Sequence, residues 1–302
     1  MKKEKSYKGI LYIVGTPIGN LDDITIRAIN TLKSVDVILA EDTRQTLKLL
    51  NHFDISKHMI SYHRHNEDDK ISKVVELLDN NKNVALVSDA GMPVISDPGQ
   101  NLVKYLVEHK YNIEVIPGVT ALITAIVKSG MDSTRFAFEG FLSVNKKQRK
   151  ERLKSLSNET RTMIFYEAPH KIIYTLKDML EYFGNRKVCI ARELTKLHEE
   201  FRYTSFEESI KNIEENGIKG EIVLLVEGAS ESKLKQNDKD YLINLNSVEL
   251  VKEYMKNGDT KKEAIKKVAK LKGVNKDIVY KECLDIKWER GYYETRGIWK
   301  IK

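Results

Sequence analysis

The segment AEDTR at residues 40–44 gathers two carboxylates and one guanidinium within four positions. Glu41 and Asp42 could accept a proton from a reacting group, and Arg44 could stabilise negative charge or orient a carboxylate beside it. The segment directly follows an expected strand at residues 37–40. We take Glu41, Asp42 and Arg44 as candidate catalytic residues, and each has a structural alternative as a salt-bridged loop residue.

Other polar side chains in the same half of the chain are further candidates. Asp23 and Arg27 are additional possibilities for a base or an orienting group. The cluster His63-Arg64-His65 suits contact with a phosphate better than it suits catalysis.

Three loops rich in glycine and proline each follow an expected strand, where open α/β sheets gather ligands. They are GTPIGN at residues 15–20, SDAGMPVISDPG at 88–99 and PGVTA at 117–121. The first lacks the Lys-Ser/Thr end of a phosphate-binding loop and the GxGxxG spacing of a dinucleotide site, so it is also explained as a tight turn. In the second, backbone amides could hold the amino-acid end of a ligand beside the apolar Val94 and Ile95. Thr120 in the third could cap a helix or bond a ligand.

Similar loops recur later, as YEAPHK at residues 166–171, ARELTK at 191–196 and KGE at 219–221. Glu167, Arg192 and Glu193 are expected to form either a functional charge cluster at a cleft between domains or an ion-pair network.

Short apolar strands alternate with helical patterns through the first 226 residues, which is typical of α/β proteins. The expected strands are residues 10–14, 37–40, 84–87, 113–116, 136–139, 162–166, 188–191 and 222–226. The expected helices are residues 25–34, a helix near Thr46, and residues 71–79, 102–108, 121–129, 146–155, 170–183 and 206–214. Continuous apolar strands indicate a sheet covered on both faces. We predict an N-terminal α/β domain at residues 1–130, a second α/β domain at 131–230, and a linker with a helical extension at 231–302.

The helical extension carries most of the excess positive charge. Of the formal net charge of +7, residues 231–302 contribute 18 basic against 12 acidic side chains. This balance indicates either contact with a polyanion or a lysine-rich solvated surface. Thr260 and Glu263 predict a capping box for a helix at residues 261–272 that ends at Gly273, and Asn275 is a plausible cap for the next helix. The spacing of Ala269, Gly273 and Val279 is that of a helix-turn-helix, or of a helical hairpin packed on its own protein. The last 15 residues show no clear period.

Composition excludes several classes of protein. The 302 residues are 41% hydrophobic and 31% charged, as in ordinary soluble proteins. No apolar run approaches the roughly 20 residues needed to cross a bilayer, and the apolar stretch near the start is too short for a signal peptide, so we expect a cytoplasmic protein that contacts no membrane. Cys189 and Cys283 are too few and too far apart for a disulfide framework or a zinc knuckle.

Taken in order, the loops resemble those of the ribosomal RNA small subunit methyltransferase I family of tetrapyrrole methylases. The similarity covers roughly residues 10–275. The matching strings are GTPIGNLDDIT, AEDTR, SDAGMPVISDPG, PGVTA, FEGFL, YEAPHK, ARELTK and KGEIVLLVEG. The resemblance implies an α/β, bilobal tetrapyrrole-methylase fold with S-adenosyl-L-methionine bound in a bent form between the two domains, often as a homodimer. The helical pattern of the tail adds a C-terminal helical extension to this fold.

The resemblance also assigns cofactor contacts by position. The residues are Pro17, Asp89, Ala90, Gly91, Met92, Pro93, Val94, Ile95, Ser96, Thr120, Ala121, Phe165, Tyr166, Glu167, Gly220 and Glu221. Two positions depart from the family pattern, because Met92 replaces a typical Thr and Val119-Thr120 replaces Pro-Ser. Both changes keep the backbone donors, but any side-chain contact at Met92 would be altered.

The implied reaction is methyl transfer to the 2′-hydroxyl of a cytidine in the decoding region of 16S RNA, with the RNA or the small ribosomal subunit as partner. An alcohol is a poor nucleophile at neutral pH, so a base or a stabilising charge should lie near it. The methyl donor is already activated, so we expect no metal, and no ligand spacing demands one. Contacts to RNA phosphates are expected from the extension and from Lys146, Lys147, Arg149, Lys150 and Arg152, for which a solvated helix face is the alternative. Two other functions remain open, a small-molecule methyltransferase of the tetrapyrrole type and a non-catalytic ribosome-binding factor.

Overall fold

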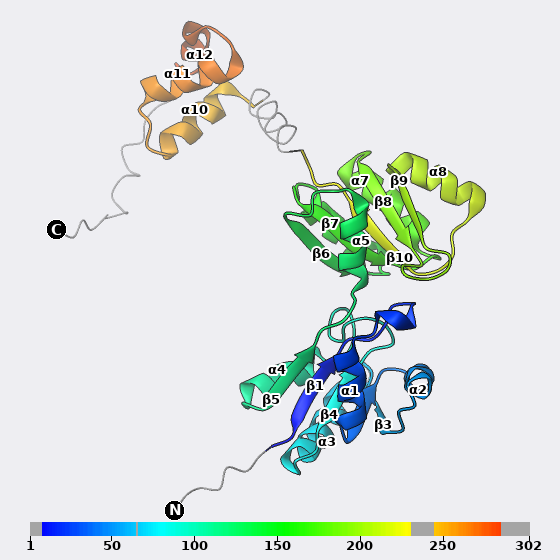
Figure 1. Cartoon of the computed structure of the whole chain (residues 1–302). Helices are drawn as coiled ribbons and strands as arrows, with labels where there is room; N and C mark the ends of the chain where they lie inside the picture. Colours follow the sequence, from blue (N-terminus) through cyan, green and yellow to red (C-terminus); the bar gives the residue numbers. More distant parts are fainter. Residues whose placement is uncertain (1–7, 65, 231–244, 285–302) are drawn as a thin grey trace, which may run out of the picture. The chain divides into compact units, whose positions relative to one another are not determined.

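The computed structural model describes residues 8–64, 66–230 and 245–284. The chain divides into two units, residues 1–229 and 230–302. The first unit contains two five-stranded sheets, drawn blue to cyan-green and green to yellow in Figure 1.

The first sheet is wholly parallel and has the strand order β3-β2-β4-β1-β5. Its strands are β1 (Ile10–Val14), β2 (Val37–Ala40), β3 (His58–Ser61), β4 (Val84–Val87) and β5 (Asn112–Ile116). The helices between them are η1 (Leu21–Asp23), α1 (Ile26–Ser34), α2 (Thr43–His52), α3 (Glu67–Asp79) and α4 (Gln100–Glu108). Strand β3 was not predicted, because it is a four-residue edge strand that buries none of its residues completely, and its two apolar residues are too short a run to stand out in the sequence.

Both faces of the first sheet are covered, as its continuous apolar strands predicted. One face packs Val14, Ile38 and Val87 against residues of α1 and α2, including Leu32 and Leu50. The other face packs against α3 and α4 in a separate cluster that includes Leu78 and Leu102. Because every strand runs parallel, the loops that follow them gather at one edge of the sheet.

The second sheet has the order β6-β7-β10-β8-β9 and is antiparallel except between β6 and β7. Its strands are β6 (Phe136–Phe141), β7 (Thr162–Glu167), β8 (Lys187–Arg192), β9 (Glu200–Ser205) and β10 (Ile222–Val226). Strand β9 was not predicted. It is an edge strand without a fully buried residue, and its two aromatic residues alternate with charged and polar ones.

Helices cover the second sheet on both faces. Helices α6 (Lys146–Leu156), α7 (Ile172–Phe183) and α8 (Phe206–Asn216) contribute to one core. Helix α5 (Ala121–Ser129) packs on the opposite face, where Ala125 and Ile126 contact residues of β7, β8 and β10. The domain boundary at residue 130 stays a prediction, but it separates α5 from the sheet on which this helix packs.

The C-terminal unit is a helical module, which we define as residues 245–284. It contains α10 (Ser247–Lys256), α11 (Lys261–Lys272) and α12 (Lys276–Glu282), with their own core around Leu250, Val268 and Val279. The capping box of Thr260 and Glu263 and the left-handed Gly273 are present as predicted. Asn275 caps α12 through its side chain. Most of the predicted linker and the last 15 residues lie outside the described residues.

None of the helices in the described part of the chain is long and apolar enough to cross a membrane.

Candidate functional site

The glycine-rich loops that follow β1 and β5 cross each other at close range. A Cβ atom at Gly15 would lie 2.8 Å from the Cα atom of Gly118, so neither position accommodates a side chain without movement. The first loop is also joined to the loop after β4, because Thr16 and Gly91 exchange backbone hydrogen bonds of 2.9 and 3.1 Å. The three loops predicted from sequence therefore form one packed assembly.

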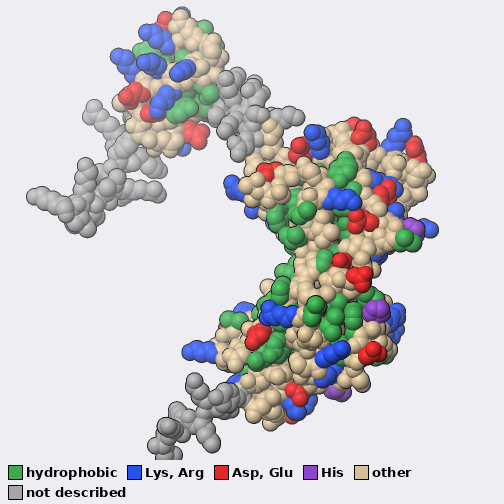
Figure 2. Space-filling model, in the orientation of Figure 1, with side chains coloured by type: hydrophobic (Ala, Val, Ile, Leu, Met, Phe, Trp, Pro, Cys, Tyr) green, Lys and Arg blue, Asp and Glu red, His purple; other side chains and the backbone are tan. Residues whose placement is uncertain are grey.

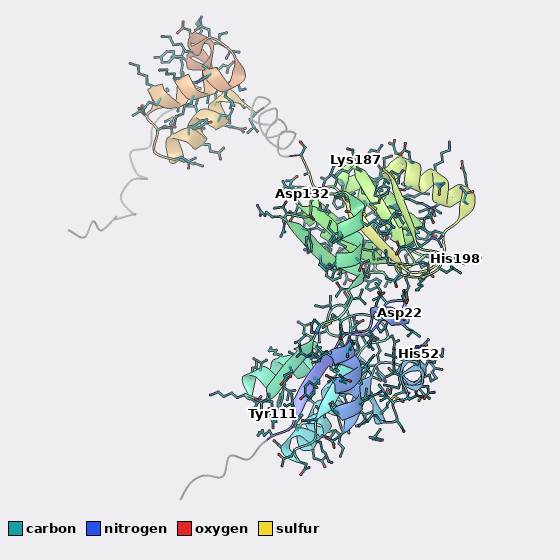
Figure 3. The ribbon with its side chains drawn as sticks, viewed as in Figure 1. Asp22, His52, Tyr111, Asp132, Lys187 and His198 are labelled. Atoms are coloured by element: carbon teal, nitrogen blue, oxygen red, sulfur yellow. The ribbon has the colours of Figure 1, made fainter. Side chains whose placement is uncertain are left out.

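These loops meet the loops of the second sheet around a cavity of about 440 Å³. Its size is typical of a small-molecule site. The lining residues are Ile18, Glu41, Asp89, Ala90, Gly91, Met92, Ile95, Ser96, Asp97, Thr120, Ala121, Phe141, Tyr166, Glu167, Ala168, Pro169, Leu194, Gly220, Glu221, Ile222 and Val223. Figure 3 labels Asp22, in η1 directly after the loop at residues 15–20, and His198, in the loop between β8 and β9. These loops touch, since a Cβ at Gly19 would collide with the Lys196 side chain.

Most residues expected to contact the cofactor line this cavity. They are Asp89, Ala90, Gly91, Met92, Ile95, Ser96, Thr120, Ala121, Tyr166, Glu167, Gly220 and Glu221. Four other expected residues, Pro17, Pro93, Val94 and Phe165, do not line it. Phe165 is fully buried in the core on the other face of the second sheet, because strand alternation turns it away from its neighbour Tyr166. The roles of all these residues stay predictions.

The loop after β4 has an unusual backbone. Val94 and Ser96 both have positive φ angles, 76° and 69°. A positive φ is sterically costly for a β-branched residue such as valine, and such conformations concentrate at functional sites. The loop is held from outside by Arg64, whose guanidinium donates to the carbonyl oxygen of Ser96. Its first carboxylate is anchored too, because the Asp42 N–H donates to Oδ1 of Asp89 at 3.0 Å.

Five carboxyl groups line the cavity, and burial raises the pKa of three of them, Glu41, Asp89 and Asp97. The pKa of Glu41 rises to about 6, first because of burial and then because Asp97 and Asp89 are nearby. Burial likewise raises the pKa of Asp97 to about 6, against a hydrogen bond from Ser88 and the charge of Arg64, which lower it. The pKa of Asp89 is also raised, mainly by burial. Carboxyls of this kind can accept or release a proton near neutral pH.

The other two candidate catalytic residues do not line the cavity. Asp42 caps α2 and receives two hydrogen bonds from the Arg44 guanidinium, at 3.0 and 2.7 Å. These bonds lower the pKa of Asp42 to about 2. The Arg44 side chain is 87% exposed. Of the three candidates in residues 40–44, the structure brings only Glu41 into the cavity.

The trio Glu167, Arg192 and Glu193 does not form a single cluster. Glu167 is buried, where it accepts hydrogen bonds from the Thr175 hydroxyl at 2.6 Å and from the N–H of Ala168 at 2.8 Å. Its carboxylate therefore fixes the start of the segment that leads into α7.

Arg192 and Glu193 belong to two separate ion-pair groups. Arg192 pairs with Glu200 at 2.9 Å on the neighbouring edge strand. Glu193 pairs with Lys196 at 3.0 Å, and Lys196 reaches Glu221 at 2.9 Å. This second group joins the loops at residues 191–196 and 219–221, and so supports one wall of the cavity.

The remaining sequence candidates lie outside the cavity wall. Arg27 is 4.0 Å from Glu114 in an exposed pair, and Asp23 ends η1. Three cations of α6 have acidic partners, which are Asp178 at 2.7 Å from Arg149, Glu181 at 2.6 Å from Lys150 and Glu139 at 2.5 Å from Arg152. Lys146 and Lys147 are exposed. His65 lies outside the described residues.

Several lining residues were not singled out from the sequence, namely Ile18, Asp97, Phe141, Ala168, Pro169, Leu194, Ile222 and Val223. Asp97 lies within the loop at residues 88–99 and Phe141 within the string FEGFL, two segments that were noted from the sequence. Loop composition could have indicated Asp97 as a carboxylate near the ligand. Phe141 reaches the cavity only through a local irregularity of its strand, which has no sequence signal of its own.

A second hollow, of about 580 Å³, is less suited to chemistry. Its lining includes Asp132 and Lys187, labelled in Figure 3. Hydrogen bonds lower the pKa values of its carboxyls Asp132 and Glu208, so both stay ionised and serve local structure. Over the described ranges, no group of three or more His, Cys, Asp or Glu side chains could hold a metal ion.

Comparison with known proteins identifies the family. Residues 10–209 match the family model described as Tetrapyrrole (Corrin/Porphyrin) Methylases. The Ribosomal RNA small subunit methyltransferase I of Halalkalibacterium halodurans is 47% identical over 93% of this chain and 98% of that relative. The chain belongs to the ribosomal RNA small subunit methyltransferase I family. The protein of the same name from Bacillus subtilis is 46% identical over 91% of this chain and 94% of that relative.

Solved structures share the fold at lower identity. Uroporphyrin-III-C-methyltransferase from Thermus thermophilus has a TM-score of 0.54 and 18% identity, and the match covers 73% of this chain and 94% of that one. A cobalt precorrin-4 methyltransferase has a TM-score of 0.56 and 17% identity, over 72% of this chain and 94% of that one. The predicted bilobal tetrapyrrole-methylase fold with a C-terminal helical extension is confirmed.

Proposed function

We propose that this protein transfers the methyl group of S-adenosyl-L-methionine to the 2′-hydroxyl of a cytidine in the decoding region of 16S ribosomal RNA. The observation that carries the proposal is the position of the Glu41 carboxyl. It lines the same cavity as most of the segments expected to hold the cofactor. The relatives from Halalkalibacterium halodurans and Bacillus subtilis are named as methyltransferases of small-subunit ribosomal RNA.

The cavity fits S-adenosylmethionine in size and chemistry. Ile18, Leu194 and Val223 give it an apolar wall suited to a nucleoside. Thr120 also lines the cavity, at the N-terminal end of α5. Because helix N-termini attract carboxylates, this part of the cavity suits the amino-acid end of the cofactor. The glycine at position 91 leaves the backbone accessible there. When bound, the cofactor supplies a methyl group that is already activated for transfer to a nucleophile.

Glu41 is the proposed base. Its raised pKa of about 6 leaves it mostly ionised at neutral pH yet basic enough to accept the proton of the ribose hydroxyl. As the hydroxyl oxygen bonds to the methyl carbon, that carbon loses its bond to sulfur, and the proton passes to the Glu41 carboxylate. Asp97 and Asp89 raise the proton affinity of Glu41, and Arg64 limits the effect.

The resemblance also implies a homodimer, which we include in the proposal. Val127 on α5 and Leu197 nearby in the loop before β9 are apolar and strongly exposed, at 78% and 93%. Exposed apolar side chains of this kind are often covered by a partner. Sedimentation equilibrium measures the assembly state directly.

The test is to incubate the purified protein with methyl-labelled S-adenosylmethionine and small ribosomal subunits that lack their native methylation. We expect one ribose in the decoding region to carry the label. Absence of label despite measured cofactor binding would contradict this substrate and favour a small-molecule methyltransferase. Tight binding to subunits without any affinity for S-adenosylmethionine in calorimetry would indicate a non-catalytic ribosome-binding factor.

A further inference from the structure

Phe141 reaches the cavity because strand β6 contains a bulge. The register against β7 shifts between Phe138 and Gly140, so Glu139 is the extra residue. Gly140 has a φ of 64°, which favours glycine and is common at such bulges. In a regular strand, the separation of three positions would place Phe141 on the opposite face of the sheet from Phe138.

The bulge instead puts Phe141 on the face that carries Phe138 and Tyr166. Phe141 pairs in register with Tyr166, and their ring centroids lie 5.5 Å apart at an angle of 64°. Phe138 also packs edge to face on Tyr166, with ring centroids 4.9 Å apart. Tyr166 and Phe138 belong to the core below α5, so the Phe141 ring stands on a fixed aromatic support.

The supported ring is itself largely uncovered. Phe141 lines the cavity and is 56% exposed, whereas Tyr166 and Phe138 are partly buried. Ile95, another lining residue, is also exposed. A large apolar ring that stays this exposed at the edge of an open cavity gains little from burial in the free protein.

A cation, Arg64, is connected to this bulge through Ser96. A Cβ at Gly140 would be 3.3 Å from Oγ of Ser96, so the bulge contacts the loop after β4. The carbonyl of the same Ser96 accepts the hydrogen bond from Arg64. Arg64 is exposed, and its charge acts on Glu41 and Asp97 inside the cavity. An aromatic face, a guanidinium and a candidate base therefore occur together.

We propose that Phe141 forms a stacking platform for the base of the target nucleotide, with Arg64 available to the adjacent phosphate. This inference rests on the proposed function and names the part of the site that would hold the RNA. Enzymes that modify nucleotides extrude the target from its stack, and an aromatic side chain replaces the lost stacking. The ring would hold the nucleotide so that its ribose stays near Glu41.

The experiment compares Phe141→Ala and Phe141→Trp with the wild-type full-length chain. Equilibrium binding of a fluorescent single-stranded RNA oligonucleotide, with S-adenosylhomocysteine present, is measured beside cofactor affinity by calorimetry. Methylation of unmethylated small subunits is measured as KM and kcat. For Phe141→Ala we expect RNA affinity to fall and KM to rise by roughly 10- to 100-fold, with cofactor affinity unchanged. Phe141→Trp should retain the wild-type RNA affinity and KM.

Tyr174→Ala is the matched control, because Tyr174 is an exposed aromatic residue on α7 that does not line the cavity. It should leave RNA binding and KM unchanged. Equal losses in the control and in Phe141→Ala would overturn the inference, as would wild-type-like RNA binding by Phe141→Ala. A loss of cofactor affinity in Phe141→Ala would instead assign the ring to the cofactor and also overturn it. The oligonucleotide measurement remains decisive even if subunits are not methylated, which would contradict the proposed function alone.

Discussion

Adjacent residues in one loop have opposite acid-base properties because their surroundings differ. Glu41 is half-buried beside other carboxyls, and its pKa rises to about 6. Asp42 is hydrogen bonded to Arg44 at the surface, so its pKa falls to about 2. A carboxyl with a pKa near 2 is too weak a base to assist an alcohol, whereas one near 6 retains useful basicity at neutral pH.

We therefore expect Glu41→Gln to reduce the methyl-transfer rate by about 10²- to 10⁴-fold, the usual worth of a general base. In the wild-type enzyme the rate should rise with pH and level off above about 6, because the ionised carboxylate is the active form. Single-turnover measurements across pH test both points. Glu108→Gln, an exposed position on α4, is the control. A Gln variant with the wild-type rate would remove Glu41 from the mechanism.

The same residue should lower stability at neutral pH. A raised folded-state pKa stabilises the protein only while the group is protonated, so this stability is present below the ordinary value of 4.5 and is lost as pH rises through about 6. After allowance for solvent screening, we expect wild type to lose about 1 kcal/mol relative to Glu41→Gln between about pH 4 and pH 8. Denaturant unfolding at both pH values measures this difference. A difference that does not change with pH would contradict it.

At the scale of elements, the cavity depends on loops whose backbones approach one another so closely that only glycine fits at the point of contact. The loops after β1 and β5 meet at Gly15 and Gly118. The loop after β4 is bonded to the first of them through Thr16. A change at the crossing should therefore affect ligand binding without touching any group that does chemistry.

Gly118→Ala should separate these loops, because the new Cβ would lie 3.0 Å from the Cα of Gly15. We expect a loss of about 1 to 3 kcal/mol in unfolding free energy, as for other overpacked sites. Affinity for S-adenosylmethionine should fall at least several-fold in calorimetry. Gly130→Ala is the matched control, since it strains a left-handed backbone but meets no atom within 4 Å. If both variants bind the cofactor alike, the crossing does not shape the site.

At the scale of the whole molecule, the chain separates its cavity from its most basic segment. All residues that line the cavity lie between Ile18 and Val223, within the first unit. The helical module has a core of its own and exposes lysines on α11. Figure 2 shows Lys and Arg side chains gathered on the visible face of this module. Lys262, Lys266 and Lys270 are spaced four residues apart, so they share one face of the helix.

A chain ending at residue 230 should therefore bind S-adenosylmethionine with unchanged affinity. If the module binds RNA, the shortened chain should bind small subunits more weakly, and the slope of log affinity against log salt should fall by about 1 for each phosphate that the module had neutralised. Binding measured at several salt concentrations tests this. An unaltered salt slope would indicate that the module is a packing element that neutralises no RNA phosphates. Loss of cofactor binding would contradict the expectation that the first unit binds the cofactor without the module.

The sequence by itself determined which segments form the core and which loops carry polar groups, because strand and helix periodicities are local properties of the chain. Strands β1, β2, β4, β5, β6, β7, β8 and β10 were all predicted, as was α11 with its capping box. Strands β3 and β9 were missed, since neither buries a residue completely and each mixes polar with apolar residues without a continuous apolar run.

Only the tertiary structure decided which polar residues share the cavity. Glu41 and Asp97 are 56 positions apart, and burial together with nearby charge sets their proton affinities. Asp42 is next to Glu41 in sequence, yet it does not line the cavity. The bulge at Gly140 turns Phe141 to the cavity face by inserting one residue, and no periodic pattern records such an insertion. Burial, electrostatic neighbours and strand register arise from contacts between distant segments, so they cannot be predicted from local sequence patterns.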